Sequence, residues 1–227
     1  LRMNPDRIAL FSYAHVPRLK PSQRVLEKAL PTPETKLQIL KMAVEKLTTD
    51  DRYIYIGMDH FAKPNDSLAI AQRTGKLDRN FQGYSTHAGA DIYAFGVSGI
   101  SQTENAYWQT EKDLQRFYSA LDQGKAPLAK AYLVSEDDRI RRETIKRVMC
   151  DLSLNFANIC EQFGIDFFRY FAREIEALGP MEQDGLIHFT PFGFEVTPMG
   201  RLLIRNVAMQ FDGYYRGEPE KRFSKTI

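Results

Sequence analysis

The first apolar run of the chain predicts a strand buried on both faces. Residues 7–14 are mostly apolar and the run closes before Pro17, which is typical of a strand in a parallel sheet. Residues 53–58 form a second run of the same character. With the helix predicted between them, residues 7–58 indicate a strand-helix-strand crossover, the unit from which parallel sheets and barrels are built.

The helix between these strands has a clear beginning and one apolar face. Thr32 can cap it, Pro33 suits its first position, and Glu34 adds an early acid. Apolar side chains then recur at helical spacing: Leu37, Leu40, Val44 and Leu47. The pattern predicts a surface helix that packs by this face.

Weaker patterns continue to about residue 121. A helix is expected from residue 65 or 66 to Thr74, ended by Gly75, with a loop over residues 79–84 held by its aromatic side chains. Residues 92–100 indicate a last strand, although Gly96 and Gly99 weaken it or mark a close backbone approach. The remaining prediction for this region is a helix over residues 104–121.

The pattern breaks at residues 122–127, where we place a domain boundary, and helical sequence dominates afterwards. Ser135 followed by Asp138 resembles a capping box that opens a helix ending near Cys150. Further helices are predicted over 152–162, 165–178 and 197–211, with a hairpin made by 185–189 and 194–196. Helices with a terminal hairpin suggest a winged-helix-like module.

Composition narrows the class of protein. Hydrophobic residues make up 43% and charged residues 26%, which is ordinary for a globular protein. Lys and Arg number 31 against 29 Asp and Glu, so the net charge of +2 argues against a nucleic-acid partner. No apolar run is long enough to span a membrane and the first residues lack a signal-peptide pattern. We therefore expect a cytoplasmic protein with no membrane partner, and a monomer.

Cysteine and histidine usage bears on metal binding. The chain has two cysteines, Cys150 and Cys160, which suit reduced thiols in a reducing compartment. An iron-sulfur cluster normally takes several cysteines at close spacing. The four histidines show no metal-ligand spacing either. No metal ligands are predicted in this chain.

Ligand residues are expected in the loops that follow the predicted strands. Backbone amides and helix amino termini converge at the carboxyl ends of strands in such units. The segments concerned are residues 13–18 and 59–80.

The chain resembles the oxygen-independent coproporphyrinogen III oxidases over nearly its whole length. The resemblance rests on ordered runs: Asn4-Pro5-Asp6-Arg7, Tyr13-Ala14-His15-Val16-Pro17, Gly57-Met58-Asp59-His60-Phe61-Ala62-Lys63-Pro64, Leu68-Ala69-Ile70-Ala71-Gln72-Arg73, Arg79-Asn80-Phe81-Gln82-Gly83-Tyr84, Arg139-Ile140-Arg141-Arg142 and Gly200-Arg201-Leu202-Leu203-Ile204-Arg205-Asn206. Ala94 and Gly99 stand where the family is expected to have Gly and Ala. Each change replaces one small residue by another.

The resemblance implies a reaction that side chains cannot perform alone. The family oxidatively decarboxylates two propionates of coproporphyrinogen III to vinyl groups, which gives protoporphyrinogen IX for haem biosynthesis. An unactivated C–H bond is too strong for a side-chain base, so a reduced 4Fe-4S cluster and S-adenosylmethionine supply the radical that removes the hydrogen atom. An electron donor and an electron acceptor are needed, and their identities stay open.

By resemblance the fold is α/β followed by mostly-α. Residues 1–122 would be the last part of a radical S-adenosylmethionine (β/α)6 barrel, and residues 123–227 a helical, winged-helix-like domain. The family's Cys-x3-Cys-x2-Cys motif lies near its amino terminus and is absent here. The chain is therefore expected to be a carboxy-terminal portion that is inactive without the missing amino-terminal half.

The same resemblance supplies the cofactor-binding candidates, because Ala14 occupies a position that contacts one bound S-adenosylmethionine in the family and Ile100 a position that contacts another. Phe11, Tyr13 and Gln82 are nearby candidates. A small Ala lets a ligand approach the backbone, Ile offers adenine an apolar surface, and Gln pairs with polar edges. Without the resemblance, ordinary packing would explain Phe11, Ala14 and Ile100 better.

Other groups invite functional readings that we do not adopt. His60 beside Asp59 suggests a general base, but ordering of the loop is the simpler explanation. Arg139, Arg141 and Arg142 could meet substrate carboxylates, or form a solvated helix face. The run Gly96-Val97-Ser98-Gly99 fits neither the dinucleotide nor the P-loop pattern. No residue is assigned a catalytic role.

Two rival functions are weighed. One is a radical S-adenosylmethionine haem chaperone, which shares the barrel, although residues 79–84 and 174–206 resemble the oxidase more closely. The other is a winged-helix nucleic-acid-binding protein. That reading would need a basic helix, and the helix before the hairpin mixes Arg169 and Arg173 with acids.

Overall fold

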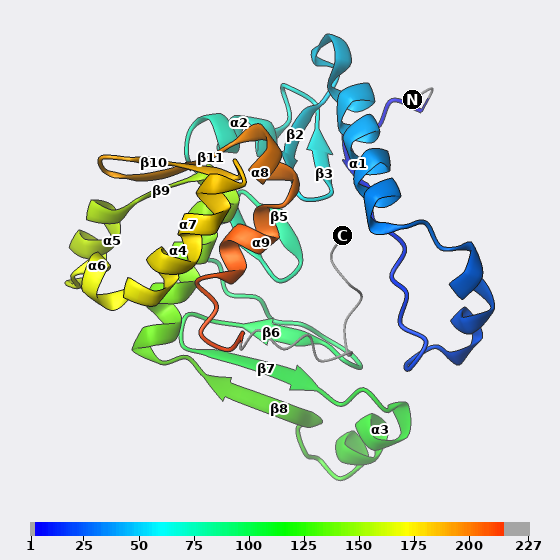
Figure 1. The fold of residues 1–227 in the computed structure, drawn as a ribbon. Helices are drawn as coiled ribbons and strands as arrows, with labels where there is room; N and C mark the ends of the chain where they lie inside the picture. Colours follow the sequence, from blue (N-terminus) through cyan, green and yellow to red (C-terminus); the bar gives the residue numbers. More distant parts are fainter. Residues whose placement is uncertain (1–2, 216–227) are drawn as a thin grey trace. The chain divides into compact units, whose positions relative to one another are not determined.

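The computed structural model describes residues 3–215 and divides the chain into two compact units (Figure 1). The first unit holds residues up to 86 together with those from 144 onward, and the second holds residues 87–143. The ends of the two predicted domains, residues 1–2 and 216–227, lie outside the described residues. The domain boundary near residue 122 remains a prediction.

The first unit contains, in chain order, β1 (Arg7–Ala9), η1 (Pro21–Ala29), α1 (Pro33–Thr48), η2 (Thr49–Asp51), β2 (Ile54–Gly57), β3 (His60–Ala62), α2 (Ser67–Arg73), β4 (Asp78–Asn80) and β5 (Gly83–Ser85). After the second unit it continues with β9 (Ser153–Asn155), α5 (Phe156–Phe163), α6 (Phe167–Tyr170), α7 (Ala172–Gln183), β10 (Ile187–Thr190), β11 (Gly193–Val196), α8 (Pro198–Leu202) and α9 (Ile204–Met209). The second unit contains β6 (Ile100–Gln102), β7 (Ala106–Thr110), α3 (Leu114–Asp122) and β8 (Leu128–Leu133). The division between units falls within α4 (Glu136–Asp151).

The strand predicted over residues 7–14 is shorter and less buried than expected. β1 covers three residues, of which Arg7 and Ala9 are exposed. The sheet order is β1-β3-β2, and β3 pairs antiparallel with both neighbours. β1 and β2 therefore run parallel to each other but do not touch as neighbours. The predictions of burial on both faces and of a parallel sheet were therefore wrong, because β1 pairs only with the antiparallel β3 and two of its three residues are exposed.

Helix α1 confirms the expected cap and apolar face. Thr32 Oγ1 accepts a hydrogen bond from the Thr35 amide at 3.2 Å, and Pro33 occupies the first position. The four predicted face residues are all partly buried. Two of them, Val44 and Leu47, pack against the cluster formed by Tyr53, Tyr55 and Phe61. This contact fixes α1 against β2 and β3.

A second cluster lies between β2 and α2. It contains Ile56, Ala62, Leu68, Ala69, Ala71, Leu77, Tyr84 and Cys150. Asp66 caps α2 by accepting from the Leu68 amide at 2.8 Å, and Gly75 follows the helix with a positive φ of 65°, as predicted. Because Cys150 belongs to α4, this cluster joins segments far apart in the sequence.

The loop predicted over residues 79–84 is instead a hairpin. β4 and β5 pair antiparallel, with Asn80 opposite Gly83, so Phe81 and Gln82 alone form the turn. The Asn80 side chain accepts from the Gln82 amide at 2.9 Å. Gly83 has a φ of +135° that side-chain-bearing residues rarely adopt. The segment is therefore a hydrogen-bonded hairpin and not a loop. Tyr84, one of its aromatic residues, is buried and does hold the segment in place.

The second unit also differs from the prediction. The strand expected over residues 92–100 is reduced to β6 and one bridge from Ile92 to Gln102, because a turn occupies residues 96–99. Gly99 does mark a close approach, since a Cβ there would lie 3.1 Å from Ala94 Cβ. β7 replaces the first part of the helix expected over 104–121, and β8 was missed. The β-forming residues Tyr107, Trp108 and Thr110 pair into a β6-β7-β8 sheet.

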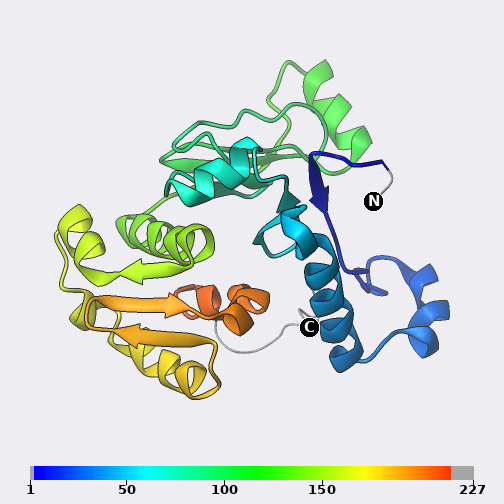
Figure 2. The same cartoon turned by 90° about the horizontal axis from the view of Figure 1, so that it is seen from above.

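The helical part after residue 135 follows the prediction more closely. Ser135 and Asp138 form the capping box, with Asp138 Oδ2 accepting from the Ser135 amide at 2.9 Å. Figure 2 shows the β10–β11 hairpin, in orange, beside β9, which the sequence did not predict. The expected final helix is broken at Leu203 into α8 and α9. Buried phenylalanines fill this part, with Phe156 and Phe167 stacked at 4.3 Å.

Two glycines in this part are required by backbone contacts, which gives a stability prediction. A Cβ at Gly193 would lie 1.8 Å from Leu154 O, and a Cβ at Gly200 would lie 1.8 Å from Leu186 O. Gly193→Ala and Gly200→Ala should each lower the free energy of unfolding by at least about 1–3 kcal/mol through overpacking. Chemical denaturation would measure the change.

Gly179→Ala is the matched control for these variants, because no atom lies within 4 Å of its added Cβ. It should change the free energy of unfolding by less than about 1 kcal/mol. Equal effects from all three variants would contradict the prediction.

Candidate functional site

One pocket of the first unit has the mixed lining of a ligand site. Its volume is about 400 Å³. Apolar and aromatic walls come from Leu10, Phe11, Tyr13, Leu40, Phe81 and Leu203. Polar and charged groups come from Lys36, Asp59, His60, Arg79, Gln82 and Arg205. A cavity that combines apolar walls with converging polar groups is typical of small-molecule binding.

Four of the five cofactor-binding candidates meet at this pocket. Phe11, Tyr13 and Ala14 reach it from the segment after β1, and Gln82 reaches it from the β4–β5 turn. The fifth candidate, Ile100, begins β6 in the second unit and is half-buried there. The role of all five in binding S-adenosylmethionine stays a prediction.

The segment carrying Ala14 is held by its backbone rather than by a core. The Leu10 amide donates to Asp59 O at 2.7 Å. Further along, Gln23 accepts from the Val16 amide at 2.6 Å and donates to Ala14 O at 3.0 Å. Phe11 lies in this segment and is 74% exposed at the pocket. The exposed aromatic and small residues are therefore available for contact with a ligand.

Asp59 and His60 are hydrogen-bonded in the wall of the pocket. Asp59 Oδ1 lies 2.8 Å from His60 Nδ1. The His60 ring meets Phe11 and Tyr84 edge-on, with centroids at 6.5 and 5.4 Å. Burial opposes ionisation of Asp59, but the hydrogen bond and charge of His60, aided by Arg79, hold its pKa below the ordinary value of 3.8. The ring is thus fixed by packing, in agreement with the loop-ordering interpretation.

Arg79 and Tyr84 lie opposite each other across the β4–β5 hairpin. The guanidinium carbon of Arg79 stands 5.7 Å from the centre of the Tyr84 ring. Tyr84 donates its hydroxyl hydrogen to Met149 O at 3.1 Å, and burial raises its pKa. Tyr84 is therefore a fixed neutral platform beneath Arg79.

The sequence did not single out the three basic residues of the pocket. Lys36 sits in the first turn of α1, Arg79 in β4 and Arg205 in α9. Arg79 and Arg205 lie inside motifs that carry the family resemblance, but those motifs are spread over more than a hundred positions. Residues of the same charge at distant positions form no recognisable pattern in the sequence. Only the fold shows that these three residues line one pocket.

The arginines weighed as carboxylate partners are engaged elsewhere. In the second unit, Arg139 donates to Asn105 Oδ1, and Arg141 pairs with Asp137 at 2.8 Å. Arg142 donates to Glu104 O at 3.1 Å. These contacts favour a structural role on α4.

The cysteines do not form a metal site with other described residues. Cys150 is buried in the core, and burial raises the pKa of its thiol to about 12. Cys160 lies on α5 and is partly exposed. Within residues 3–215, no three His, Cys, Asp or Glu side chains gather closely enough to hold a metal ion.

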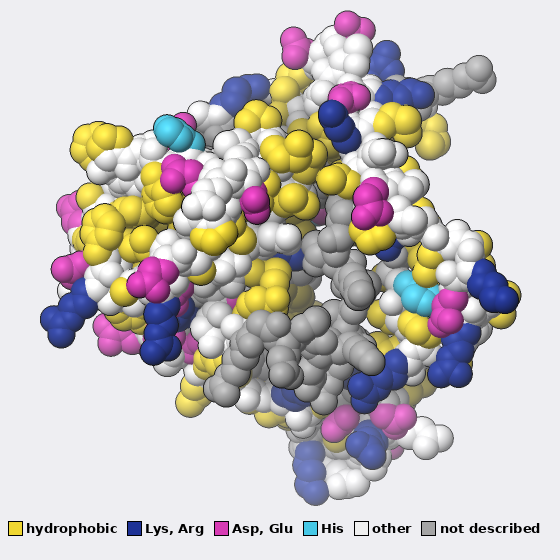
Figure 3. All heavy atoms as spheres, in the orientation of Figure 1, with side chains coloured by type: hydrophobic (Ala, Val, Ile, Leu, Met, Phe, Trp, Pro, Cys, Tyr) yellow, Lys and Arg dark blue, Asp and Glu magenta, His cyan; other side chains and the backbone are white. Residues whose placement is uncertain are grey.

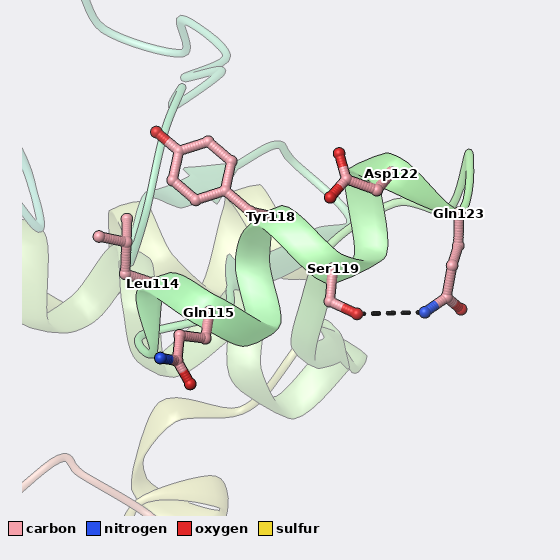
Figure 4. Close-up of a pocket in the computed structure, with 6 residues that line it drawn as sticks. All are labelled: Leu114, Gln115, Tyr118, Ser119, Asp122 and Gln123. Carbon is pink, nitrogen blue, oxygen red and sulfur yellow. Dashed lines mark hydrogen bonds between the residues drawn. The ribbon is translucent and has the colours of Figure 1, made fainter.

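A second hollow lies along α3 and has no such chemistry. Figure 4 shows Leu114, Gln115, Tyr118, Ser119, Asp122 and Gln123 along one helix, with a 3.1 Å hydrogen bond from Gln123 to Ser119. All of its lining residues come from α3 and its end, so it lacks the converging elements of the first pocket.

The surface carries hydrophobic and charged side chains in mixture on the face that Figure 3 displays. None of the helices described between residues 3 and 215 has the length and apolar character needed to cross a membrane.

Comparison with known proteins now defines the class. The family model described as HemN C-terminal domain matches residues 134–203. The chain is also similar to a solved structure titled "Coproporphyrinogen III oxidase (HemN) from Escherichia coli is a Radical SAM enzyme", with a TM-score of 0.89 and 43% identity. This match covers 94% of the chain and 49% of that structure. The fold is that of part of a radical S-adenosylmethionine enzyme.

Curated relatives then specify the family. The oxygen-independent coproporphyrinogen III oxidase of Synechocystis is 46% identical over all of this chain and half of its own length. That of Thermostichus vulcanus is 46% identical over all of this chain and 70% of its own length. That of Escherichia coli K12 is 43% identical, with 99% and 50% covered. The chain belongs to the oxygen-independent coproporphyrinogen III oxidase family, and it spans about half the length of the Synechocystis and Escherichia coli relatives.

The Asp59–His60 pair gives a titration prediction. In His60→Ala, Asp59 loses both a hydrogen bond and a positive charge, so its pKa should rise toward 3.8. In His60→Gln, which keeps a donor without the charge, the rise should be smaller. Carbon-detected NMR of the Asp59 carboxyl would measure both.

The lowered pKa of Asp59 also affects how the free energy of unfolding depends on pH. A carboxyl whose folded-state pKa is lowered stabilises the fold above its unfolded-state pKa, and this contribution is lost as pH falls through the folded-state value. His60→Ala should therefore lose less stability on acidification than the unmodified chain. His188→Gln is the control, since His188 is exposed and lies beside Glu182 instead. An unchanged Asp59 pKa in His60→Ala would contradict the assignment.

Proposed function

We propose that this chain is the carboxy-terminal portion of an oxygen-independent coproporphyrinogen III oxidase. The reaction is the oxidative decarboxylation of two propionates of coproporphyrinogen III to vinyl groups, which gives protoporphyrinogen IX. Each propionate loses one hydrogen atom, one carbon dioxide and one electron. The whole protein would be a cytoplasmic, monomeric radical S-adenosylmethionine oxidoreductase of haem biosynthesis, with an electron donor and acceptor still to be identified.

The pocket of the first unit is the observation that carries this proposal. Four candidates chosen from the family resemblance, at positions 11, 13, 14 and 82, line one cavity of about 400 Å³. The chain is 42–46% identical to curated oxidases over 99–100% of its length. Those relatives carry the oxidase name, which favours the oxidase over the related haem chaperone.

The residues of the pocket fit S-adenosylmethionine better than they fit an iron-sulfur cluster. Aromatic and small residues at 11, 13 and 14 offer an apolar wall, and Gln82 offers both a donor and an acceptor. The two cysteines lie on α4 and α5, outside this pocket. The 4Fe-4S cluster would therefore be held by the amino-terminal half.

This chain's residues would position and protect the reactants. When bound, the cluster and S-adenosylmethionine supply the radical chemistry that side chains lack. Ala14, held by Gln23, lets a ligand approach the backbone closely. Phe11, Tyr13 and Phe81 cover the ligand and exclude water, which protects a reactive intermediate from side reactions.

The finer architecture belongs to the same proposal. Residues 1–122 would complete a (β/α)6 barrel together with the amino-terminal half, and residues 123–227 would form a winged-helix-like domain. The antiparallel β9–β11 sheet, which α7 and α8 contact, supports the second assignment. Ile100, in the second unit, would contact another S-adenosylmethionine than the one at Ala14.

Cluster reconstitution tests the proposal. This chain alone should show no 4Fe-4S absorbance and no anaerobic conversion of coproporphyrinogen III. A chimera that joins the amino-terminal half of the Synechocystis relative to this chain should show both, because it restores the family's cysteine motif. Absorbance spectra and chromatography of the porphyrin products would measure the two properties.

The matched control is the same chimera with the three motif cysteines changed to serine. It should fold, as judged by circular dichroism, yet bind no cluster and form no product. Turnover by the 227 residues alone would overturn the proposal, as would a cluster-loaded chimera that never converts the substrate.

A further inference from the structure

We propose that Arg79 is the anchor of a carboxylate-binding site in the pocket of the first unit, supported by Lys36 and Arg205. The inference rests on the proposed function and deepens it, because it assigns residues to the carboxylates of the ligand. In this proposal, Arg79 positions the ligand by binding its carboxylate.

The charge of the pocket favours an anionic group. Three of its lining residues are basic, and Asp59 is its one carboxylate among the described lining residues. Asp59 is already paired with His60 at 2.8 Å. The pocket therefore has an excess of positive charge, although the whole chain has a net charge of only +2.

Arg79 has one buried donor that no described residue satisfies. Its Nε is buried and has no hydrogen-bond partner. The neighbouring acid, Asp78, lies on the opposite face of β4, since side chains alternate along a strand, and pairs with Lys146 at 3.5 Å. A buried guanidinium N–H without a partner is costly, and a ligand carboxylate would satisfy it.

The surroundings of Arg79 hold its guanidinium in place. It lies over the Tyr84 ring, and the Tyr84 hydroxyl is fixed to Met149 O at 3.1 Å. A guanidinium that lies over an aromatic ring still has its terminal N–H groups for a bidentate bond to a carboxylate. A lysine at this position would keep the charge but lose the planar pair of donors.

Two ligands of the proposed reaction carry a carboxylate of this kind. One is the tetrapyrrole, through its propionates, and the other is S-adenosylmethionine, through its amino-acid end. The shared chemistry is a carboxylate next to a large apolar or aromatic group, which matches a pocket lined both by basic residues and by Phe11, Tyr13 and Phe81.

Equilibrium binding to this chain tests the site without turnover. The probes are coproporphyrin III and its tetramethyl ester, followed by fluorescence, and S-adenosylmethionine and its decarboxylated form, followed by calorimetry. The chain should bind one of the two acids about 10- to 100-fold more tightly than its carboxylate-free partner, as a charge-assisted hydrogen bond provides. The pair that shows the preference identifies the source of the carboxylate.

Variants then assign the preference to Arg79. Arg79→Gln should weaken binding of the preferred acid about 10- to 100-fold and leave binding of its carboxylate-free partner unchanged. Arg79→Lys should recover part of the loss. Arg173→Gln on α7, an exposed arginine outside the pocket, is the matched control and should bind as the unmodified chain does.

Equal binding of acid and carboxylate-free probe by the unmodified chain would overturn the site, and so would failure to bind either acid. These outcomes would not decide the proposed function, which the cluster experiment tests separately. The ester and decarboxylated comparisons use the unmodified chain, so they hold even if an Arg79 variant fails to fold.

Discussion

The site depends on how strand β2 is fixed by two segments that are distant in sequence. Ile56 O accepts a hydrogen bond from Gln72 of α2 at 2.6 Å and one from Arg201 of α8 at 3.4 Å. The Arg201 guanidinium also stands 4.8 Å from the centre of the Tyr55 ring, and burial lowers its pKa. A desolvated arginine is tolerated only where hydrogen bonds and an aromatic face compensate it. This contact joins the amino-terminal sheet to the carboxy-terminal helices within one unit.

The pocket follows from that connection. Arg201 is followed by Leu202, Leu203, Ile204 and Arg205, and these four residues line the pocket together with the segment after β1. The β4–β5 hairpin closes another side, because Tyr84 is anchored to Met149 of α4. Five separate segments of the chain, the other two being α1 and the β2–β3 turn, thus line the cavity, and none of them could form it alone. Ligand contacts come from exposed loop residues positioned by a buried framework.

Family membership and the proposed chemistry are consistent with this arrangement, in which exposed loop residues contact the ligand and a buried framework positions them. The chain spans about half the length of the Synechocystis and Escherichia coli oxidases. It provides aromatic walls and basic groups, whereas its two cysteines lie away from the pocket. Radical chemistry needs a cofactor to create the reactive species and a protein to place and protect it. The described residues are suited to the second task.

The sequence by itself determined the elements whose signals are local. The caps of α1, α2 and α4, the β10–β11 hairpin and the family motifs were all predicted, because a cap or turn depends on residues within a few positions of each other. Tertiary structure decided the rest. The sequence of β1 predicts a buried strand, yet two of its three residues are exposed. Strands β7, β8 and β9 form because they pair with neighbouring strands, and the sequence does not specify these partners. Arg79 and Arg205 became one basic site only when folding placed them at the same pocket, since charge carries no periodicity that links distant positions.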